Sequence, residues 1–254
     1  MSLQVLALLA AAAFFAGLVD AIAGGGGLVT VPALLAAGLD PKIALATNKG
    51  QAVFGAISSC VQFWRKGAVS KERAPLAFAL GLAGSVGGSL LVLAVPPGPL
   101  KPLVIVLLLL AAVVVMVPKA VFLKLGVQDL RHPMLVFGGV ALAIGAYDGF
   151  FGPGTGSMLI AAHVLLFGDA PTRASGNAKV GNLASNVAAF TLFAVRGAIV
   201  WKIALTMAVA NALGAAVGAR LALHVGDRLV RVAVLVVVAA LIVKVGFDLL
   251  HPAR

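Results

Sequence analysis

Charged residues are scarce in this chain of 254 residues: Asp, Glu, Lys and Arg together make up 11% of it, against about 25% in an average soluble domain. Hydrophobic residues make up 62%, and the mean hydropathy is +1.13. A soluble fold of this size would have to expose much of this apolar excess, and no long hydrophilic block is present. The composition therefore predicts an integral membrane protein and excludes a large soluble domain, and with it most enzymes that work in water.

The sequence also lacks the common signatures of catalytic and metal sites. It contains no G-x-x-x-x-G-K-[ST] phosphate loop and no H-E-x-x-H zinc motif, and its single cysteine, Cys60, has no partner for an internal disulfide. We therefore expect no cofactor and no metal. An intramembrane hydrolase stays open as an alternative, since it would need only Ser157 with His163, or Asp20 and Asp148 as a carboxylate pair.

Acidic residues are fewer than basic ones, 8 against 19, so the net charge is +11. The Lys and Arg residues lie mainly in short loops between apolar runs, at 65–73 and 119–131, which the positive-inside rule places in the cytoplasm. No basic block carries interleaved aromatic residues on a polar face, so we expect no nucleic-acid partner. The expected surroundings are a lipid bilayer, and the oligomeric state stays open.

The chain contains one pattern twice. Four short motifs, here called anchors, occur in both copies in the same order. The first, Gly17-Leu-Val-Asp20, recurs 128 positions later, and the other three recur 130 positions later. The paired anchors are Asp20 with Asp148, Lys49 with Lys179, Lys66-Gly67 with Arg196-Gly197, and Gly84/Gly88 with Gly214/Gly218. We predict two homologous halves, residues 1–118 and 133–254, joined by a basic cytoplasmic linker at 119–132.

Each half contains the same series of segments: a spanning helix, a glycine-rich break, a short apolar segment and three longer helices. The predicted ranges are 3–22, 28–38, 43–64, 75–95 and 101–118, then 133–151, 156–167, 178–195, 202–223 and 229–249. The short segments are well below the roughly 20 residues that cross the hydrocarbon. We predict an all-α, polytopic membrane protein of two homologous helical repeats with short broken or re-entrant helices.

Two topologies fit these segments. If the short segment crosses, each half has five crossings, the halves are inverted and the termini lie outside. If it dips in and returns, each half has four crossings, the halves are parallel and the termini lie inside. Counting Lys and Arg does not separate them, because both topologies place ten on one side and five on the other. We favour inverted halves, since opposite-facing copies explain alternating access most simply.

Two lysines lie where lipid is expected. Lys49 is seven residues past Lys42 at a predicted helix start, or roughly 10 Å along the axis, and Lys179 occupies the equivalent place. An ammonium near the bilayer centre costs about 2.5–3.5 kcal/mol on insertion scales, and two such cations would repel each other unless an anion lay between them. We therefore predict an anionic substrate. The alternative is that each lysine reaches the headgroups or pairs with Asp20 or Asp148.

Polar groups beside the lysines and at the two glycine breaks complete the predicted substrate site. Amide groups can donate hydrogen bonds to an oxyanion, and each short helix would offer free N–H groups and a positive dipole end. Asp20 and Asp148 could carry a coupling proton or sodium ion, or cap the short helices. The other predicted site residues are Thr47, Asn48, Gln51, Asn177, Asn182 and Asn186, then Gly24, Gly25, Gly26 and Gly27, and Gly152, Pro153, Gly154, Thr155, Gly156 and Ser157.

With these residues the sequence resembles the TauE/SafE family of sulfite exporters and related permeases, in particular its bacterial YfcA-like branch. The resemblance covers nearly the whole chain. It implies a bacterial inner-membrane permease whose relatives handle sulfite, sulfonates or similar organosulfur anions. The motifs that carry it are Asp20-Ala-Ile-Ala-Gly-Gly-Gly-Gly27, Ala46-Thr-Asn-Lys49, Tyr147-Asp-Gly-Phe-Phe-Gly-Pro-Gly-Thr-Gly156, and Ala178-Lys179 with Asn182 and Asn186.

Substrates vary within this family, so the resemblance favours a small anion over sulfite in particular. We predict a secondary transporter for small anions that works by alternating access, with one repeat rocking against the other. A channel-like protein or a lipid-precursor carrier on the same scaffold is the first alternative. The intramembrane hydrolase is the second.

Overall fold

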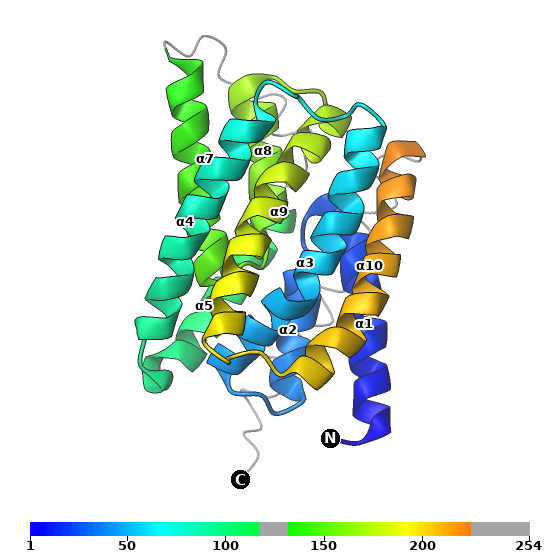
Figure 1. Ribbon diagram of the computed structural model, residues 1–254, viewed down its shortest axis with the longest axis vertical. Coiled ribbons are helices and arrows are strands. Elements are labelled where there is room, and N and C mark those ends of the chain that lie inside the picture. The colour runs from blue at the N-terminus through cyan, green and yellow to red at the C-terminus, as the bar shows by residue number, and fades with distance from the viewer. Residues whose placement is uncertain (117–131, 225–254) are drawn as a thin grey trace.

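The computed structural model describes residues 1–116 and 132–224, and all regular structure in these ranges is α-helical. This confirms the predicted all-helical, polytopic class (Figure 1). Residues 119–131 of the predicted linker (119–132) and the predicted helix at 229–249 lie outside the described residues. The helices are α1 (Leu3–Ala23), α2 (Gly27–Ala36), α3 (Pro41–Arg65), α4 (Ala74–Ala94), α5 (Pro97–Met116), α7 (Pro133–Phe150), α8 (Thr155–Phe167), α9 (Pro171–Val195) and α10 (Trp201–His224).

Within the described ranges, α1, α4, α7, α9 and α10 are long and apolar enough to cross a membrane. Helices α2 and α8 are shorter, with 10 and 13 residues. Helix α9 begins at Pro171, seven residues before the predicted start at 178. The first turns of α9 contain the polar residues Thr172, Arg173 and Ser175, so the hydropathy pattern does not indicate a helix there. The proline at the first helical position is the sequence signal for this helix start.

Eight of the nine described helices fall into two bundles, and α5 contacts both, through α2 and α3 and through α8. Helices α1, α2, α3 and α10 pack together, and so do α4, α7, α8 and α9; the two groups stand side by side in Figure 1. Each bundle therefore takes most of its helices from one predicted half and one helix from the other half. Helix α10 is the predicted counterpart of α4, so the two halves exchange equivalent helices.

Equivalent helices of the two halves run in opposite directions (Figure 1). Residue numbers rise together along the α1–α10 and α4–α7 contacts, which makes the helices of each pair parallel. The backbone contacts are Phe14 and Leu18 with Gly214 and Gly218, and Leu142 and Ala146 with Gly84 and Gly88. Helices α1, α3 and α10 point one way and α4, α7 and α9 the other. Inverted copies would be arranged in this way, although the copy relationship itself rests on the sequence pattern.

Helix α2 returns the chain to the side on which α1 begins. Leu34, near its end, belongs to one apolar cluster with Leu6 and Leu9 of α1 and with Ala44 at the start of α3. Helix α3 thus starts where α1 starts and runs in the same direction. Successive segments of this half alternate in direction, as they do in the first of the two predicted topologies.

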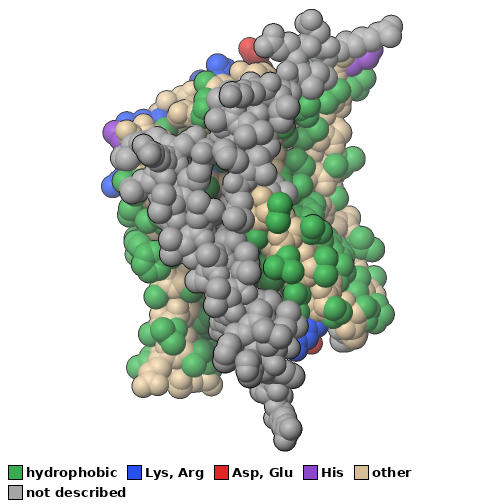
Figure 2. Space-filling model, turned by 180° about the vertical axis from the view of Figure 1, so that it is seen from behind, with side chains coloured by type: hydrophobic (Ala, Val, Ile, Leu, Met, Phe, Trp, Pro, Cys, Tyr) green, Lys and Arg blue, Asp and Glu red, His purple; other side chains and the backbone are tan. Residues whose placement is uncertain are grey.

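Apolar side chains cover much of the outer surface. Leu135 is 75% exposed and Val195 80% exposed, and Figure 2 shows hydrophobic side chains along the visible flanks, with Lys and Arg toward the two ends. Such a surface is stable in lipid and not in water. Together with the candidate spans it identifies a multi-pass membrane protein.

The helix pairs α4–α7 and α1–α10 approach so closely that only glycine fits at their contacts. A Cβ atom built at Gly88 would lie 1.9 Å from the carbonyl oxygen of Ala146, whereas one at Gly87 would meet nothing within 4 Å. Small residues at helix contacts are the usual basis of tight packing in membranes. The backbone contact at Gly88 therefore fixes the distance between α4 and α7.

We predict that Gly88→Leu destabilises the protein by about 3 kcal/mol, because the added side chain forces the two helices apart. Gly87→Leu is the matched control, on the neighbouring open position of the same helix. The thermal denaturation midpoint of the purified protein in detergent measures both. Equal midpoints for the two variants would contradict the proposed backbone contact.

Candidate functional site

Two buried ion pairs connect the bundles at the centre of the molecule. Lys49 Nζ of α3 lies 2.7 Å from Asp148 Oδ1 of α7, and Lys179 Nζ of α9 lies 3.2 Å from Asp20 Oδ2 of α1. Lys49 is 3% exposed and Lys179 is fully buried. Each ammonium of one half is therefore paired with a carboxylate of the other half.

This arrangement corrects the predicted reason for an anion. The two lysines do not face each other as unbalanced cations, because Asp148 and Asp20 supply opposite charges at ion-pair distance. The structure instead has the alternative arrangement, in which each lysine pairs with an aspartate. An unpaired buried charge is strongly destabilising, so the duplicated Lys and Asp positions make sense as one electrostatic unit. When all four groups are ionised, this unit carries no net charge.

The aspartates also occupy the helix starts that the sequence analysis assigned to a substrate. Asp20 accepts a hydrogen bond from the Gly26 amide at 3.4 Å, at the start of α2. Asp148 accepts one from Thr155 Oγ1 at 2.9 Å, at the start of α8. The positive ends of the two short helices thus act first on side chains of the protein itself.

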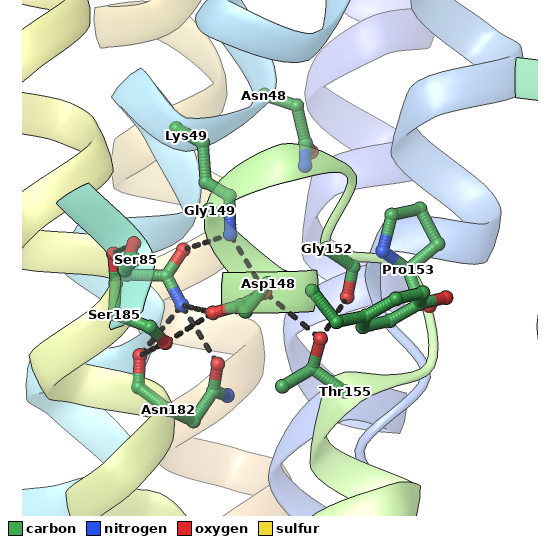
Figure 3. A network of polar contacts seen from close by, with 12 residues as sticks. Asn48, Lys49, Ser85, Asp148, Gly149, Gly152, Pro153, Thr155, Asn182 and Ser185 are labelled. Carbon is green, nitrogen blue, oxygen red and sulfur yellow. Dashed lines mark hydrogen bonds and ion pairs between the residues drawn. The ribbon is translucent and has the colours of Figure 1, made fainter. Parts of the chain in front are cut away.

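Asp148 is enclosed by donors, as Figure 3 shows. Besides Lys49 and Thr155, it accepts hydrogen bonds from Ser185 Oγ and from Asn186 Nδ2, the latter at 3.5 Å. Asp148 is 1% exposed. Ser185 is not among the predicted site residues, although it lies three residues after Asn182 and so shares a helix face with it.

Asp20 has fewer and longer contacts. Its carboxylate oxygens accept from Lys179 Nζ at 3.2 Å, from Asn182 Nδ2 at 3.3 Å and from the Gly26 amide at 3.4 Å. The side chain is 23% exposed. Of the two equivalent carboxylates, Asp20 is therefore the one that is less completely satisfied.

A polar cavity of about 30 Å³ is lined by Lys49, Asp148 and Asp20 of the two ion pairs, but not by Lys179. A single water needs about 10–15 Å³ by this measure, so the cavity has room for roughly two. The sequence analysis missed Ala52 and Asn211 as lining residues, although Asn211 is marked by its amide in an otherwise apolar stretch of α10. The predicted site residues that line the cavity are Asp20, Gly26, Gly27, Asn48, Lys49, Gln51, Asp148, Gly152, Asn182 and Asn186.

Thr47 and Asn177 are predicted site residues that do not line this cavity. Thr47 Oγ1 accepts from the Val200 amide at 3.2 Å, and Asn177 Oδ1 accepts from the Ser70 amide at 2.7 Å. Each precedes its lysine by two residues, which turns the side chain about 200° around the helix. Both therefore fix a loop of the opposite half, and their roles are equivalent.

The remaining predicted site residues belong to the two glycine-rich breaks, at 24–27 and 152–157, and connect these breaks to each other. Gly24 ends α1 with φ +79°, and a Cβ there would lie 2.2 Å from the Gly156 backbone. Ser157 donates from its amide to Gly24 O at 3.3 Å and from its hydroxyl to Ala23 O. Pro153 O accepts from the Tyr147 hydroxyl at 2.7 Å. Gly24, Gly25, Pro153, Gly154, Thr155, Gly156 and Ser157 do not line the cavity.

The hydrolase constellations are not formed by the described side chains. Ser157 donates to a backbone carbonyl, while His163 Nδ1 lies 3.1 Å from Asp169 Oδ2. Asp20 and Asp148 are each paired with a lysine, so they do not share a proton as the carboxylates of an aspartic protease do. Neither pair has the geometry of a nucleophile with its base or of a catalytic dyad.

Asp169, between α8 and α9, forms a second polar cluster that the sequence analysis did not anticipate. It accepts from Arg73 at 2.5 Å, from Asn177 Nδ2 at 2.8 Å and contacts His163. Burial raises the pKa of this carboxyl, but the hydrogen bonds from His163, Arg73 and Asn177 outweigh burial and lower the pKa from 3.8 to about 2. The cluster joins the α3–α4 loop to the α8–α9 loop.

Broken helices that meet at a buried, charged and polar centre are typical of membrane transporters. The comparisons with known proteins agree. The family model "Sulfite exporter TauE/SafE" matches residues 9–245, and the chain belongs to this family.

Similar proteins carry names of the same class. "Probable membrane transporter protein ORF9" of Sinorhizobium sp. is 38% identical over 100% of this chain and 97% of that protein. "Probable membrane transporter protein YfcA" of Escherichia coli K12 is 39% identical over 93% of this chain and 87% of that protein. A "Probable membrane transporter protein" of Haemophilus influenzae is 38% identical over 97% and 96%. No solved structure matches. The family resemblance seen in the sequence is confirmed.

We predict that the Lys49–Asp148 pair stabilises the fold chiefly by mutual neutralisation. Lys49→Met and Asp148→Asn should each lower stability by about 3–5 kcal/mol, because each leaves a buried charge without its partner. The double variant should be more stable than either single variant. Thermal denaturation of all four proteins gives the coupling between the two sites, and additive losses would contradict it.

We also predict that the stabilising contribution of Asp169 is independent of pH near neutrality and is lost in acid. Because its pKa is lowered on folding, the contribution is complete above about pH 5 and declines as the pH falls through 3.8 toward about 2. The difference in denaturation midpoint between wild type and Asp169→Asn should therefore shrink between pH 6 and pH 3. A constant difference would contradict the lowered pKa.

Proposed function

We propose that the protein is a secondary transporter for small oxyanions of the sulfite or sulfonate type. The observation that carries this proposal is the pair of buried lysines, contributed by opposite halves to the point where two broken helices meet. The name of the family, sulfite exporter TauE/SafE, supports the sulfite-type substrate class. Small anions have little apolar surface, and a polar cavity with ammonium and amide donors suits them.

An entering anion would compete with a carboxylate for an ammonium group. Lys49 is the more accessible lysine, because its side chain lines the cavity. Gly152 stands beside it, and a Cβ at that position would lie 2.9 Å from Lys49 Nζ. The absence of a side chain at Gly152 thus leaves the ammonium open to a ligand. The amides of Asn182 and Asn186 line the same cavity and complete the set of donors.

Transport of a sulfite or sulfonate ion requires a larger opening than the cavity of about 30 Å³. The units that move in our proposal are the two helix bundles rather than the two sequence halves, because α10 packs on α1 and α4 packs on α7. Both ion pairs cross the interface between the bundles. The connecting loops contain Gly67 and Gly197 with φ of +68° and +65°, which are suitable hinge positions.

Exchange of pairing partners would link binding to this movement. When a substrate anion takes the ammonium of Lys49, Asp148 loses its ionic contact across the interface. The interface between the bundles is then held by fewer polar contacts and can open. Alternating access would follow from repeating this exchange on the other side of the molecule.

We predict that the double variant Lys49→Gln/Asp148→Asn folds but does not transport. It removes the ammonium without leaving an unpaired charge, so loss of uptake cannot be explained by unfolding. Uptake of radiolabelled sulfite and of methanesulfonate into proteoliposomes measures activity, and a denaturation midpoint close to that of the wild type establishes folding.

Lys202→Met is the matched control, since Lys202 is an exposed lysine at the start of α10. It should transport at the wild-type rate. Wild-type uptake by the double variant would overturn the role of Lys49. A wild-type protein that takes up neither anion would overturn the proposed substrate class.

A further inference from the structure

The two Lys–Asp pairs are equivalent in sequence but not in their surroundings. Asp148 receives hydroxyl hydrogen bonds from Thr155 and Ser185. The equivalent positions around Asp20, at offsets of 128 and 130 residues, are Gly27 and Gly55. Asp20 therefore lacks both hydroxyl donors, and it borders the cavity with 23% of its side chain exposed. This asymmetry gives Asp20 free capacity for a further ligand.

Gln51, which lines the same cavity, has a side-chain oxygen without a hydrogen-bond partner. Gln51 is 1% exposed, and its Nε2 donates to Asn48 Oδ1 at 2.9 Å. Thr30 Oγ1 donates to the same Asn48 oxygen at 2.5 Å, and in this arrangement Gln51 turns its nitrogen toward Asn48 and its oxygen away from it. Among the described residues, Gln51 Oε1 is the one buried side-chain nitrogen or oxygen without a hydrogen-bond partner. An acceptor in this situation needs an explanation, such as an ion.

We propose that Asp20 and Gln51 hold a sodium ion in this cavity, and that its binding is coupled to the binding of the substrate anion. Hard cations of this kind take oxygen ligands, and a carboxylate with an amide carbonyl supplies them. Asp20 lies in the last turn of α1, where the negative end of the helix dipole favours a cation. The coupling rests on the proposed function; the sodium site itself does not.

Charge balance gives the reason for coupling. The four ionised side chains are neutral together, so an anion alone would leave one net negative charge in a buried site, and sodium alone one net positive charge. When both bind, sodium takes the carboxylate of Asp20 and the anion takes the ammonium of Lys49, which lines the same cavity. The two added charges cancel, so the centre stays neutral. Each ligand then increases the affinity for the other by the same factor.

The first experiment tests the sodium site without any anion substrate. The thermal denaturation midpoint of the purified protein is measured in sodium chloride and in choline chloride at equal ionic strength. We expect sodium to raise the midpoint of wild type by several degrees. Gln51→Leu should abolish this shift, whereas Gln51→Glu, which keeps the oxygen and adds charge, should retain or increase it. Gln62→Leu, on the same helix with its amide bonded to Ala216 O, is the matched control.

Three outcomes would overturn the site. These are the absence of a sodium-specific shift in wild type, a wild-type shift in Gln51→Leu, and loss of the shift in Gln51→Glu, which would show that the NH₂ group matters instead. Asp20→Asn provides an independent check, because it removes the charged ligand and should also abolish the shift.

The second experiment tests the coupling. The dissociation constant for sulfite is measured with and without sodium, and we expect sodium to tighten it by about tenfold, within the usual range for coupled sites. A sulfite affinity that depends on pH and not on sodium would overturn the proposal in favour of a proton. A sodium shift in a protein that binds no sulfite would support the cation site and overturn the anion function.

Discussion

Charge neutralisation across the interface between two helix bundles is the constraint on which this structure depends. Lys49 and Lys179 would each be very unfavourable inside a bilayer, and so would Asp20 and Asp148. Crossed pairing makes all four tolerable. The polar faces of α3 and α9 are oriented toward each other by these pairs, and the broken ends of α1 and α7 are positioned beside them.

Glycines allow close backbone contacts both within each bundle and between the bundles. Within each bundle, Gly17, Gly84, Gly88, Gly145, Gly214 and Gly218 bring backbones into contact. Between the bundles, the two breaks touch through Gly24 and Gly156. Close backbone packing joins the helices inside a bundle, whereas the interface between the bundles combines apolar clusters with the two ion pairs. The ion pairs are the contacts at this interface that a charged ligand can replace.

Much of the fold could be predicted from the sequence, because the repeat and the hydropathy pattern are strong signals. The helices, the short segments and the burial of Lys49 and Lys179 within the molecule followed from them. The pairing partners did not follow, since it takes three-dimensional proximity to choose between an external anion and the carboxylate of the other half. Thr47 and Asn177 were misplaced because adjacency in sequence was given more weight than the direction of the side chain on a helix. Ser185, Asn211 and the Asp169 cluster depend on contacts between distant segments.

The Asp169 cluster has a consequence for the symmetry of the molecule. Arg73 and Asp169 join two loops by an ion pair, but the positions equivalent to them, at an offset of 130 residues, are Ile203 and Leu39, which belong to one apolar cluster. Loops at one end of the molecule are therefore joined by an ion pair, and the equivalent positions at the opposite end are joined by apolar packing. Acid removes the charge on Asp169 and so weakens the ion pair, whereas cold weakens apolar contacts. The two ends of a nearly symmetric scaffold therefore respond to different conditions.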